Sequence, residues 1–315
     1  MSKATIIGAG SVGATIAYTM ALDGIVSEIV IIDINEKKAY GEAMDISHAA
    51  PFSAPVTIYS GSYEDAVGSD IVVITSGLPR KAGQSRLDLA QANVNVIKDI
   101  TPSIVKYAPD AVYILVSNPV DVLTYVFHKI SGIPEDRIIG SGTILDTSRL
   151  RAHIAGHFDI NQKSVHAYVF GEHGDSSFVP WSLATIASVP IEAYEASLDE
   201  NKRAKLKDFN YEEMVEYTKK SGGVIIANKG ATFYGVAVSV CHICKCLLGS
   251  KDTILTVSTM MHGEFGIDDV CLSGLALVGA GGIKGRIIPP LTEEEKDKFV
   301  YSANKIKEVI NSVTI

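Results

Sequence analysis

The chain has 315 residues, of which 47% are hydrophobic and 20% charged, a composition typical of soluble globular proteins rather than of disordered ones. The formal net charge of −8 at pH 7 argues against a nucleic-acid partner, whose phosphates attract basic surfaces. The N-terminus lacks the apolar run of a signal peptide, and no later stretch is long enough to span a bilayer. We therefore expect a cytoplasmic protein without membrane contact.

The first 33 residues predict a strand, a glycine-rich turn, a helix and a second strand. Residues 4–7 and 28–32 are short apolar runs, and residues 14–22 have the composition of a helix. The turn at residues 8–13 has glycine at its first, third and last positions, and Asp33 ends the second run. A glycine turn alone is weak evidence for a ligand, but the flanking strands and the acid make a dinucleotide site the favoured interpretation.

Each glycine of this turn has a distinct expected role. Gly8 permits the tight turn, Gly10 lets backbone amides approach a pyrophosphate, and Gly13 lets the helix and strand pack closely. The helix N-terminus adds partial positive charge. Asp33 is placed to accept hydrogen bonds from the adenine ribose and to repel a 2′-phosphate, so NAD is expected rather than NADP. The alternative is a glycine turn that binds no ligand.

Two further apolar runs, residues 71–75 and 111–116, are bounded by turn residues, which is typical of a parallel sheet covered on both faces. Asn118 follows the second run at the carboxyl end of its strand, where ligands gather in such sheets. We expect an α/β fold in which a doubly wound parallel sheet, residues 1–141, binds the cofactor. An α+β substrate and catalytic domain, residues 142–315, follows it.

Residues 77–86 form a loop containing glycine and proline, and its cations include Arg80 and Arg86. Such a loop can close over a bound ligand and bring its charges with it. The alternative is an ordinary solvated loop, because exposed charges are common.

The second half of the chain supplies a candidate acid/base group. His173 lies between glycines, and an imidazole transfers protons near neutral pH when a carboxylate orients it. Asp146 is the candidate carboxylate, and on a helix Arg149 would lie one turn later on the same face. A surface histidine, with Asp146 as a helix cap paired to Arg149, is the alternative.

The four cysteines do not predict a metal site. Cys241 and Cys244 have a two-residue spacing, but no second pair completes a zinc site. Residues 231–248 carry apolar side chains at helical intervals, so we expect these thiols on the buried side of a helix.

In combination, these motifs resemble the NAD-dependent L-lactate/malate dehydrogenase family, and the similarity covers essentially the whole chain. It implies a Rossmann domain with NAD as cofactor and a small 2-keto or 2-hydroxy acid as substrate. It also implies that His173 is the general acid/base, held by Asp146, and that Arg149 binds the substrate carboxylate. Arg86 would then polarise the reacting carbonyl, and Asn118 would contact both substrate and nicotinamide.

Within this family, most of the chain resembles the lactate branch, as Glu172, Trp181 and Thr232 indicate. The residue that contacts the substrate's third carbon is usually glutamine in lactate enzymes and arginine in malate enzymes, and here it is Arg80. A guanidinium enclosed with a methyl group would remain unpaired, whereas oxaloacetate offers it a carboxylate. We therefore expect oxaloacetate and L-malate, with pyruvate and L-lactate as the alternative. Thr232 would narrow the space for the longer substrate.

Two further expectations concern regulation and assembly. A catalytically inactive NAD-binding regulator is a remote alternative, because the catalytic residues that the resemblance implies are all present. The resemblance implies a homotetramer, with a dimer as the other possibility. In similar bacterial enzymes, an arginine and a histidine matching Arg151 and His166 bind fructose 1,6-bisphosphate across a subunit interface, so an anionic effector site is expected there. An ordinary salt bridge and a buried histidine are the alternative.

Overall fold

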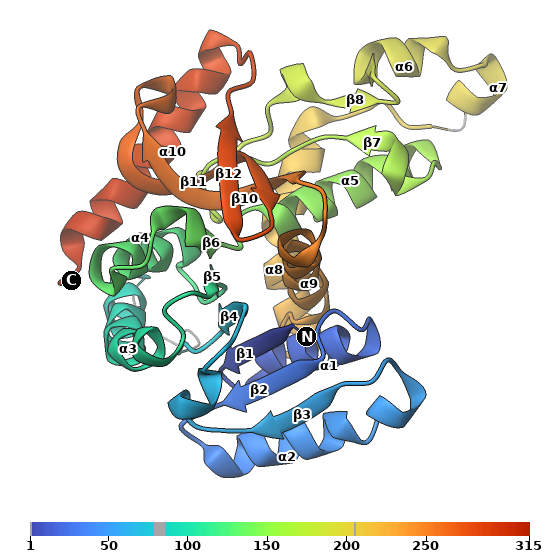
Figure 1. Cartoon of the computed structure of the whole chain (residues 1–315). Coiled ribbons are helices and arrows are strands. Elements are labelled where there is room, and N and C mark those ends of the chain that lie inside the picture. Colours follow the sequence, from blue (N-terminus) through green and yellow to red (C-terminus); the bar gives the residue numbers. More distant parts are fainter. Residues whose placement is uncertain (1, 79–85, 205) are drawn as a thin grey trace.

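The computed structural model of this protein describes residues 2–78, 86–204 and 206–315. Within these residues, nine strands form one mixed sheet through the molecule (Figure 1). The strands are β1 (Lys3–Ile7), β2 (Glu28–Ile32), β3 (Thr57–Ser60), β4 (Ile71–Ile74), β5 (Val112–Leu115), β6 (Ile138–Gly140), β10 (Thr253–His262), β11 (Asp268–Gly279) and β12 (Gly282–Ile287). Their order across the sheet is β12-β11-β10-β6-β5-β4-β1-β2-β3.

The strands from β3 to β6 in this order are mutually parallel. The chain begins at the centre with β1, proceeds outward to β3, returns to β4 on the other side of β1 and continues to β6. The helices of this half are α1 (Ser11–Leu22), α2 (Glu36–Ser47), α3 (Arg86–Tyr107) and α4 (Val120–Ser131). This is the doubly wound parallel sheet predicted from the sequence, so the fold-class prediction is confirmed.

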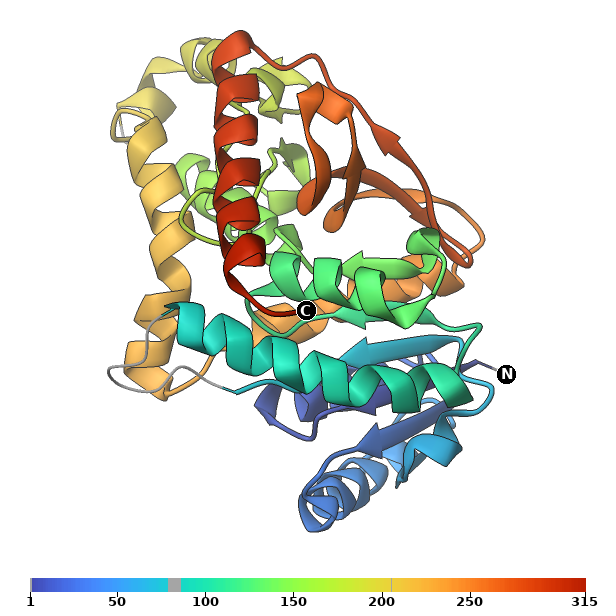
Figure 2. The same ribbon diagram turned by 90° about the vertical axis from the view of Figure 1, so that its left-hand side faces the viewer.

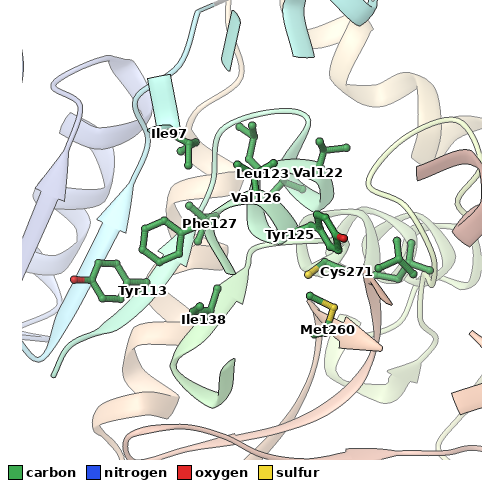
Figure 3. Packing of buried hydrophobic residues seen from close by; sticks show 14 of the residues in the cluster. Ile97, Tyr113, Val122, Leu123, Tyr125, Val126, Phe127, Ile138, Met260 and Cys271 are labelled. Carbon is green, nitrogen blue, oxygen red and sulfur yellow. The ribbon is translucent and has the colours of Figure 1, made fainter. Parts of the chain in front are cut away.

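Both faces of the central parallel strands β1, β4, β5 and β6 are buried. On β4, Val72 and Ile74 pack in one apolar cluster with α3 and α4, whereas Ile71 and Val73 pack in a second cluster with α1, α2 and α9 (Tyr234–Leu248). Figure 3 shows the first cluster, in which the rings of Tyr113 and Phe127 have their centroids 4.9 Å apart. Burial on both faces explains why these strands are continuous apolar runs without polar alternation.

The C-terminal half adds antiparallel strands and further helices. Strand β10 pairs antiparallel with β6 through Ser258 and Gly140, and β11 and β12 continue the sheet from it. The sheet therefore continues beyond the predicted domain boundary at residues 141–142. The remaining elements are α5 (Ile144–Phe158), β7 (Val165–His166), β8 (Thr185–Ile186), β9 (Val189–Pro190), α6 (Ile191–Ser197), α7 (Glu200–Arg203), α8 (Tyr211–Lys229) and α10 (Glu293–Ser312).

Short 3₁₀ helices complete the secondary structure, and β7, β8 and β9 form a small separate sheet. The 3₁₀ helices span Ala50–Phe52, Tyr63–Ala66, Glu135–Arg137, Gln162–Ser164, Trp181–Leu183 and Glu264–Gly266. Helix α8 runs along one side of the molecule as a single long element (Figure 2). It packs on α5 through a third apolar cluster that includes Leu150, Ile154 and Met214.

The predicted thiol-bearing helix is observed as α9. Cys241, Cys244 and Cys246 are buried on it, and Cys271 is buried on β11; none of the four forms a disulfide. Burial raises the pKa of Cys241 to about 12, so this thiol is protonated and packs as a small apolar group. No helix within the described ranges is both long and apolar enough to cross a membrane.

Candidate active site

A cavity of about 310 Å³ lies where the carboxyl ends of β5 and β6 meet the helices of the C-terminal half. The first turn of α1 contributes Val12 to its wall, and α5 contributes Asp146 and Arg149. Helix α8 contributes a longer stretch that begins at Thr218. The cavity is therefore built from both halves of the chain, and this is the arrangement needed to bring a cofactor and a substrate together.

Within this cavity His173, Asp146 and Arg149 form a connected group. Oδ2 of Asp146 lies 2.5 Å from Nδ1 of His173, and Oδ1 accepts a hydrogen bond from Nη1 of Arg149 at 3.0 Å. The side chain of His173 is 25% exposed and that of Asp146 10%, so the imidazole faces the cavity while the carboxylate lies behind it. The structure brings these three predicted residues together, and their catalytic roles stay predictions.

The charges around His173 and Asp146 favour a protonated imidazole paired with an ionised carboxylate. Burial alone would lower the pKa of His173, but the charge and hydrogen bond of Asp146, with a smaller contribution from Asp121, raise it above the ordinary value. Burial likewise opposes the charged form of Asp146, but His173 and then Arg149 hold the pKa of this carboxyl below its ordinary value. The two groups titrate as a coupled pair. The imidazole is thus stabilised in its proton-donating form, with Nε2 free of the Asp146 contact.

Asp121 is a second buried carboxylate beside His173 that sequence reasoning missed. It lies in the first turn of α4, and its Oδ2 accepts a hydrogen bond from the backbone N–H of His173 at 2.8 Å. Its Oδ1 accepts a hydrogen bond from the hydroxyl of Ser258 at 2.6 Å. The available signal was a single acid inside the apolar run that follows Asn118.

The loop that carries His173 is held in place by contacts with α10 and β11. Gly171 has a φ of +88°, and a Cβ there would lie 2.5 Å from the Ser302 hydroxyl of α10. The backbone N–H of Glu172 donates to that hydroxyl at 2.8 Å, and the N–H of Gly171 donates to the carbonyl oxygen of Ser273 on β11 at 2.9 Å. A glycine is therefore required at position 171 for both its backbone conformation and the close approach of α10.

Asn118 lines the cavity at the carboxyl end of β5, as predicted. The Asn93 side chain holds this segment in place, because its Nδ2 donates to the Asn118 carbonyl oxygen at 2.7 Å. Oδ1 of Asn93 accepts a hydrogen bond from the backbone N–H of Leu78 at 2.7 Å. Asn93 is almost fully buried on α3, and it links the segments that follow β4 and β5.

The glycine turn has the geometry expected of a pyrophosphate cradle. Gly8 has a φ of +113°, and a Cβ on Gly13 would lie 1.9 Å from the Gly8 carbonyl oxygen, so these two glycines close the turn onto the helix. In contrast, a Cβ on Gly10 would have no heavy atom within 4 Å, which leaves space in front of the α1 N-terminus. No side chain caps α1, and its first turn carries no acid. Its amide groups are therefore suited to an anionic ligand.

Asp33 is held at the end of β2 by two backbone groups. Ala9 N–H donates to its Oδ2 at 2.6 Å, and Asn35 N–H donates to its Oδ1 at 2.8 Å. Its carboxylate lies at the predicted position beside the glycine turn. The residues present therefore fit an adenosine nucleotide, with the ribose expected at Asp33 and the pyrophosphate at Gly10.

The remaining predicted residues are placed as follows. Thr232, which lies between α8 and α9, lines the cavity. Arg151 points away from the cavity, where its Nε donates to the Ala167 carbonyl oxygen at 2.9 Å, and His166 is exposed on β7. Arg80 lies outside the described residues, and of Arg86 only its place as the first residue of α3 is described.

Two family models match the chain almost from end to end. The model of the lactate/malate dehydrogenase NAD binding domain matches residues 2–140, and that of the lactate/malate dehydrogenase alpha/beta C-terminal domain matches residues 143–314. The chain belongs to the lactate/malate dehydrogenase family. Its membership identifies it as an NAD-dependent enzyme, and the fit of the glycine turn to a dinucleotide agrees with that cofactor.

Several similar proteins are named L-lactate dehydrogenases. The L-lactate dehydrogenase of Acetivibrio thermocellus is 45% identical over 315 residues, covering 100% of this chain and 98% of the relative. Among solved structures, a lactate dehydrogenase from a Medee basin deep-sea metagenome library has a TM-score of 0.94 at 35% identity, covering 99% of this chain and 98% of the other. The minor L-lactate dehydrogenase of Enterococcus mundtii has a TM-score of 0.92 at 35% identity, covering 100% and 99%.

These relatives favour the lactate alternative over the oxaloacetate and L-malate expectation derived from Arg80. They match this chain over nearly its whole length, whereas the expectation for malate depends on the single residue Arg80. Within the described part of the chain, no three His, Cys, Asp or Glu side chains are grouped so as to hold a metal ion.

Proposed function

We propose that this enzyme reduces pyruvate to L-lactate with NADH, and catalyses the reverse reaction, using His173 as the acid/base group. The observation that carries the proposal is the His173, Asp146 and Arg149 group, which opens into a cavity shared by both halves of the chain. The choice of pyruvate rests on the relatives, which are named L-lactate dehydrogenases.

The chain's own residues divide the work of binding and proton transfer. Arg149 presents a planar guanidinium to the cavity and binds the substrate carboxylate. The hydride is supplied by NADH when it is bound. As the carbonyl oxygen gains negative charge, the protonated His173 donates its proton, and the ion pair with Asp146 keeps that proton available beforehand. The resemblance to the family assigns Arg86 the role of a further cation for this oxygen.

A second candidate substrate is oxaloacetate, and the residue that favours it is Arg80. A cation facing the methyl group of pyruvate has no partner, whereas the second carboxylate of oxaloacetate would pair with it. A site built to satisfy a polar group can discriminate by roughly 10⁴ against an analogue that lacks the matching group. Thr232 at the cavity wall supports the smaller substrate, because its side chain occupies space that the longer acid would need.

We also propose that Arg151 and His166 contribute to an anion site between subunits of a homotetramer. The guanidinium of Arg151 stacks over the Tyr168 ring with its central carbon 4.9 Å from the ring centroid, and burial lowers the pKa of Arg151. His166, two residues before Tyr168 in the sequence, is exposed. A symmetry axis would bring two copies of this pair together, and a bisphosphate such as fructose 1,6-bisphosphate would match their charge.

The deciding experiment compares steady-state rates of NADH oxidation with pyruvate and with oxaloacetate as substrates. The proposal expects kcat/KM for pyruvate to exceed that for oxaloacetate by roughly tenfold or more, which corresponds to about 1.4 kcal/mol. If kcat/KM for oxaloacetate is the higher by this factor, oxaloacetate rather than pyruvate is the preferred substrate. Absence of turnover with both acids, in protein that binds NADH, would refute the dehydrogenase assignment of the site.

A further inference from the structure

Asp121 is a buried carboxylate of the site whose hydrogen bonds, among the described residues, come from a backbone N–H and a hydroxyl rather than from a cationic side chain. It is 1% exposed, and its two oxygens accept hydrogen bonds from the backbone N–H of His173 at 2.8 Å and from the Ser258 hydroxyl at 2.6 Å. These donors lie 52 and 137 residues away in the sequence. Asp121 therefore joins α4 to the catalytic loop and to β10.

A capping role does not account for this residue. The N-cap position of α4 is Pro119, which makes no side-chain cap, and the oxygens of Asp121 point to other elements rather than to its own helix. An asparagine could satisfy the same two neighbours, since its amide oxygen accepts from the His173 N–H and its amide nitrogen can donate to the Ser258 hydroxyl. A buried charge is costly when a neutral group would satisfy the same hydrogen bonds. Hydrogen bonding alone therefore does not explain why this position carries a carboxylate rather than an amide.

We propose that Asp121 is a positioning residue that acts through His173. Its hydrogen bond fixes the backbone that carries the imidazole, and its negative charge joins that of Asp146 in favouring the protonated ring. The proposal rests on the proposed role of His173 as acid/base group, and it adds to that role a second carboxylate, which is bonded to the histidine backbone whereas Asp146 is bonded to the ring.

The surroundings of Asp121 support an electrostatic role. Burial, followed by the smaller effect of the nearby Glu172 charge, raises the pKa of Asp121, and the hydrogen bonds of Ser258 and His173 limit the rise to about 6. The Asp121 charge also contributes to raising the pKa of the Cys271 thiol of β11, which lies well above its ordinary value mainly because of burial. Asp121 is thus charged near neutral pH, and its contribution to His173 is present when the enzyme works under these conditions.

The experiment measures His173 directly and compares the result with turnover. The protein is labelled with isotopic histidine, the His173 resonance is assigned by its loss in His173→Asn, and its pKa is measured by NMR in the wild type and in Asp121→Asn. The expected result is a pKa lower by roughly one unit in Asp121→Asn. The alkaline limb of the rate of keto acid reduction should move down by the same amount.

Two further variants make the test specific. Asp269→Asn removes an exposed carboxylate that pairs with Lys129 of α4, so it changes the charge near the same helix and should leave the His173 pKa unchanged. Ser258→Ala keeps the Asp121 carboxylate but removes a hydrogen bond that stabilises its charge, so a smaller shift in the direction of Asp121→Asn is expected.

Each outcome has a defined meaning. An unchanged His173 pKa in folded Asp121→Asn overturns the proposal, and if that variant does not fold, an unchanged pKa in Ser258→Ala does so. A shifted pKa that the rate profile follows supports it. If the pKa shifts but the rate profile stays in place, the coupling is supported and the acid/base role of His173 in the proposed function is refuted.

Discussion

The backbone N–H of Ala9 donates a 2.6 Å hydrogen bond to Oδ2 of Asp33, which ties the glycine turn to the end of the neighbouring strand. The two segments that we expect to contact different parts of a dinucleotide are thereby held at a fixed separation. The carboxylate also receives the Asn35 N–H at Oδ1, so its orientation is set before a ligand arrives.

This arrangement predicts cofactor choice. Asp33→Ser removes the charge that would repel a 2′-phosphate and leaves a hydroxyl able to accept from Ala9. The ratio of kcat/KM for NADPH to that for NADH should rise roughly tenfold or more. Asp45→Ser, at an exposed position on α2, is the control and should leave the ratio as in the wild type. An unchanged ratio in Asp33→Ser would mean that the ribose is recognised elsewhere.

Gly10 and Gly13 provide a matched pair of substitutions. In Gly13→Ala the new Cβ would meet the Gly8 carbonyl oxygen at 1.9 Å, so the free energy of unfolding should fall by about 1–3 kcal/mol in urea denaturation. In Gly10→Ala the new Cβ meets nothing within 4 Å, and stability should change by less than about 1 kcal/mol. NADH affinity, measured by fluorescence titration, should nevertheless weaken in Gly10→Ala, since the Cβ enters the space expected for the pyrophosphate. Retained affinity would place the pyrophosphate elsewhere.

The pKa shifts of the catalytic pair fix the sign of the pH dependence. Keto acid reduction needs protonated His173, so its rate is full at low pH and falls as the pH rises through a pKa above the ordinary histidine value. Hydroxy acid oxidation needs the neutral ring and shows the opposite trend. Asp146→Asn removes the main influence that raises this pKa, so the fall should begin at lower pH and kcat should drop by roughly 10²- to 10⁴-fold.

The same pair contributes to stability in a defined pH window. The pKa of Asp146 is lowered in the folded state, so its contribution is present above the unfolded value and is lost as the pH falls through the folded value. The pKa of His173 is raised, so its contribution is present below the unfolded value and is lost as the pH rises through the folded value. The free energy of unfolding of Asp146→Asn, measured by denaturation at a series of pH values, should depend less on pH in both the acidic and the alkaline range. A pH profile identical to that of the wild type would contradict the ion pair.

Sequence patterns predicted those parts of the site whose residues are close in the chain. Asp146 and Arg149 are one helical turn apart, and the turn that begins at Gly8 precedes Asp33 within a single βαβ unit, so periodicity and glycine spacing sufficed. Asp146 was a candidate partner of His173 on chemical grounds alone, with a surface histidine as the alternative; because 27 residues separate the two, only the resemblance to the family favoured the pairing.

Asp121 and Asn93 could not be found in this way. Asp121 finds its donors only after β10 has joined the sheet and the His173 loop has packed against α4. Asn93 lies inside a long helix, where its spacing from Leu78 and Asn118 carries no periodic signal. Both are buried polar residues whose partners are set by tertiary packing, and local propensity does not record such partners.

Substrate choice is testable at Arg80. Arg80→Gln removes the cation that would pair with the second carboxylate of oxaloacetate while leaving Arg149 and His173 in place. The ratio of kcat/KM for pyruvate to that for oxaloacetate should rise at least roughly tenfold. Arg137→Gln, which removes a surface cation paired with Asp110, is the control for the change of net charge. An unchanged ratio in Arg80→Gln would show that this residue does not contact the substrate.

The effector site makes a separate prediction. Fructose 1,6-bisphosphate should lower the apparent KM for the keto acid at low enzyme concentration and shift sedimentation toward the tetramer. Arg151→Gln should abolish both responses, while Lys163→Gln, which removes an exposed cation in the turn before β7, should keep them. If the effector changes neither KM nor assembly in the wild type, Arg151 and His166 do not form an effector site.

The pairing of β10 with β6 has a mechanical consequence. Gly140 and Ser258 approach so closely that a Cβ on Gly140 would lie 2.8 Å from that of Ser258, and Gly142 is confined in the same way by the Ser258 backbone. A hinge motion that separated the halves here would have to break the pairing of β10 with β6 and expose backbone groups that now form hydrogen bonds with each other. The pairing of β10 with β6 therefore opposes a jaw-like opening of the molecule at this point.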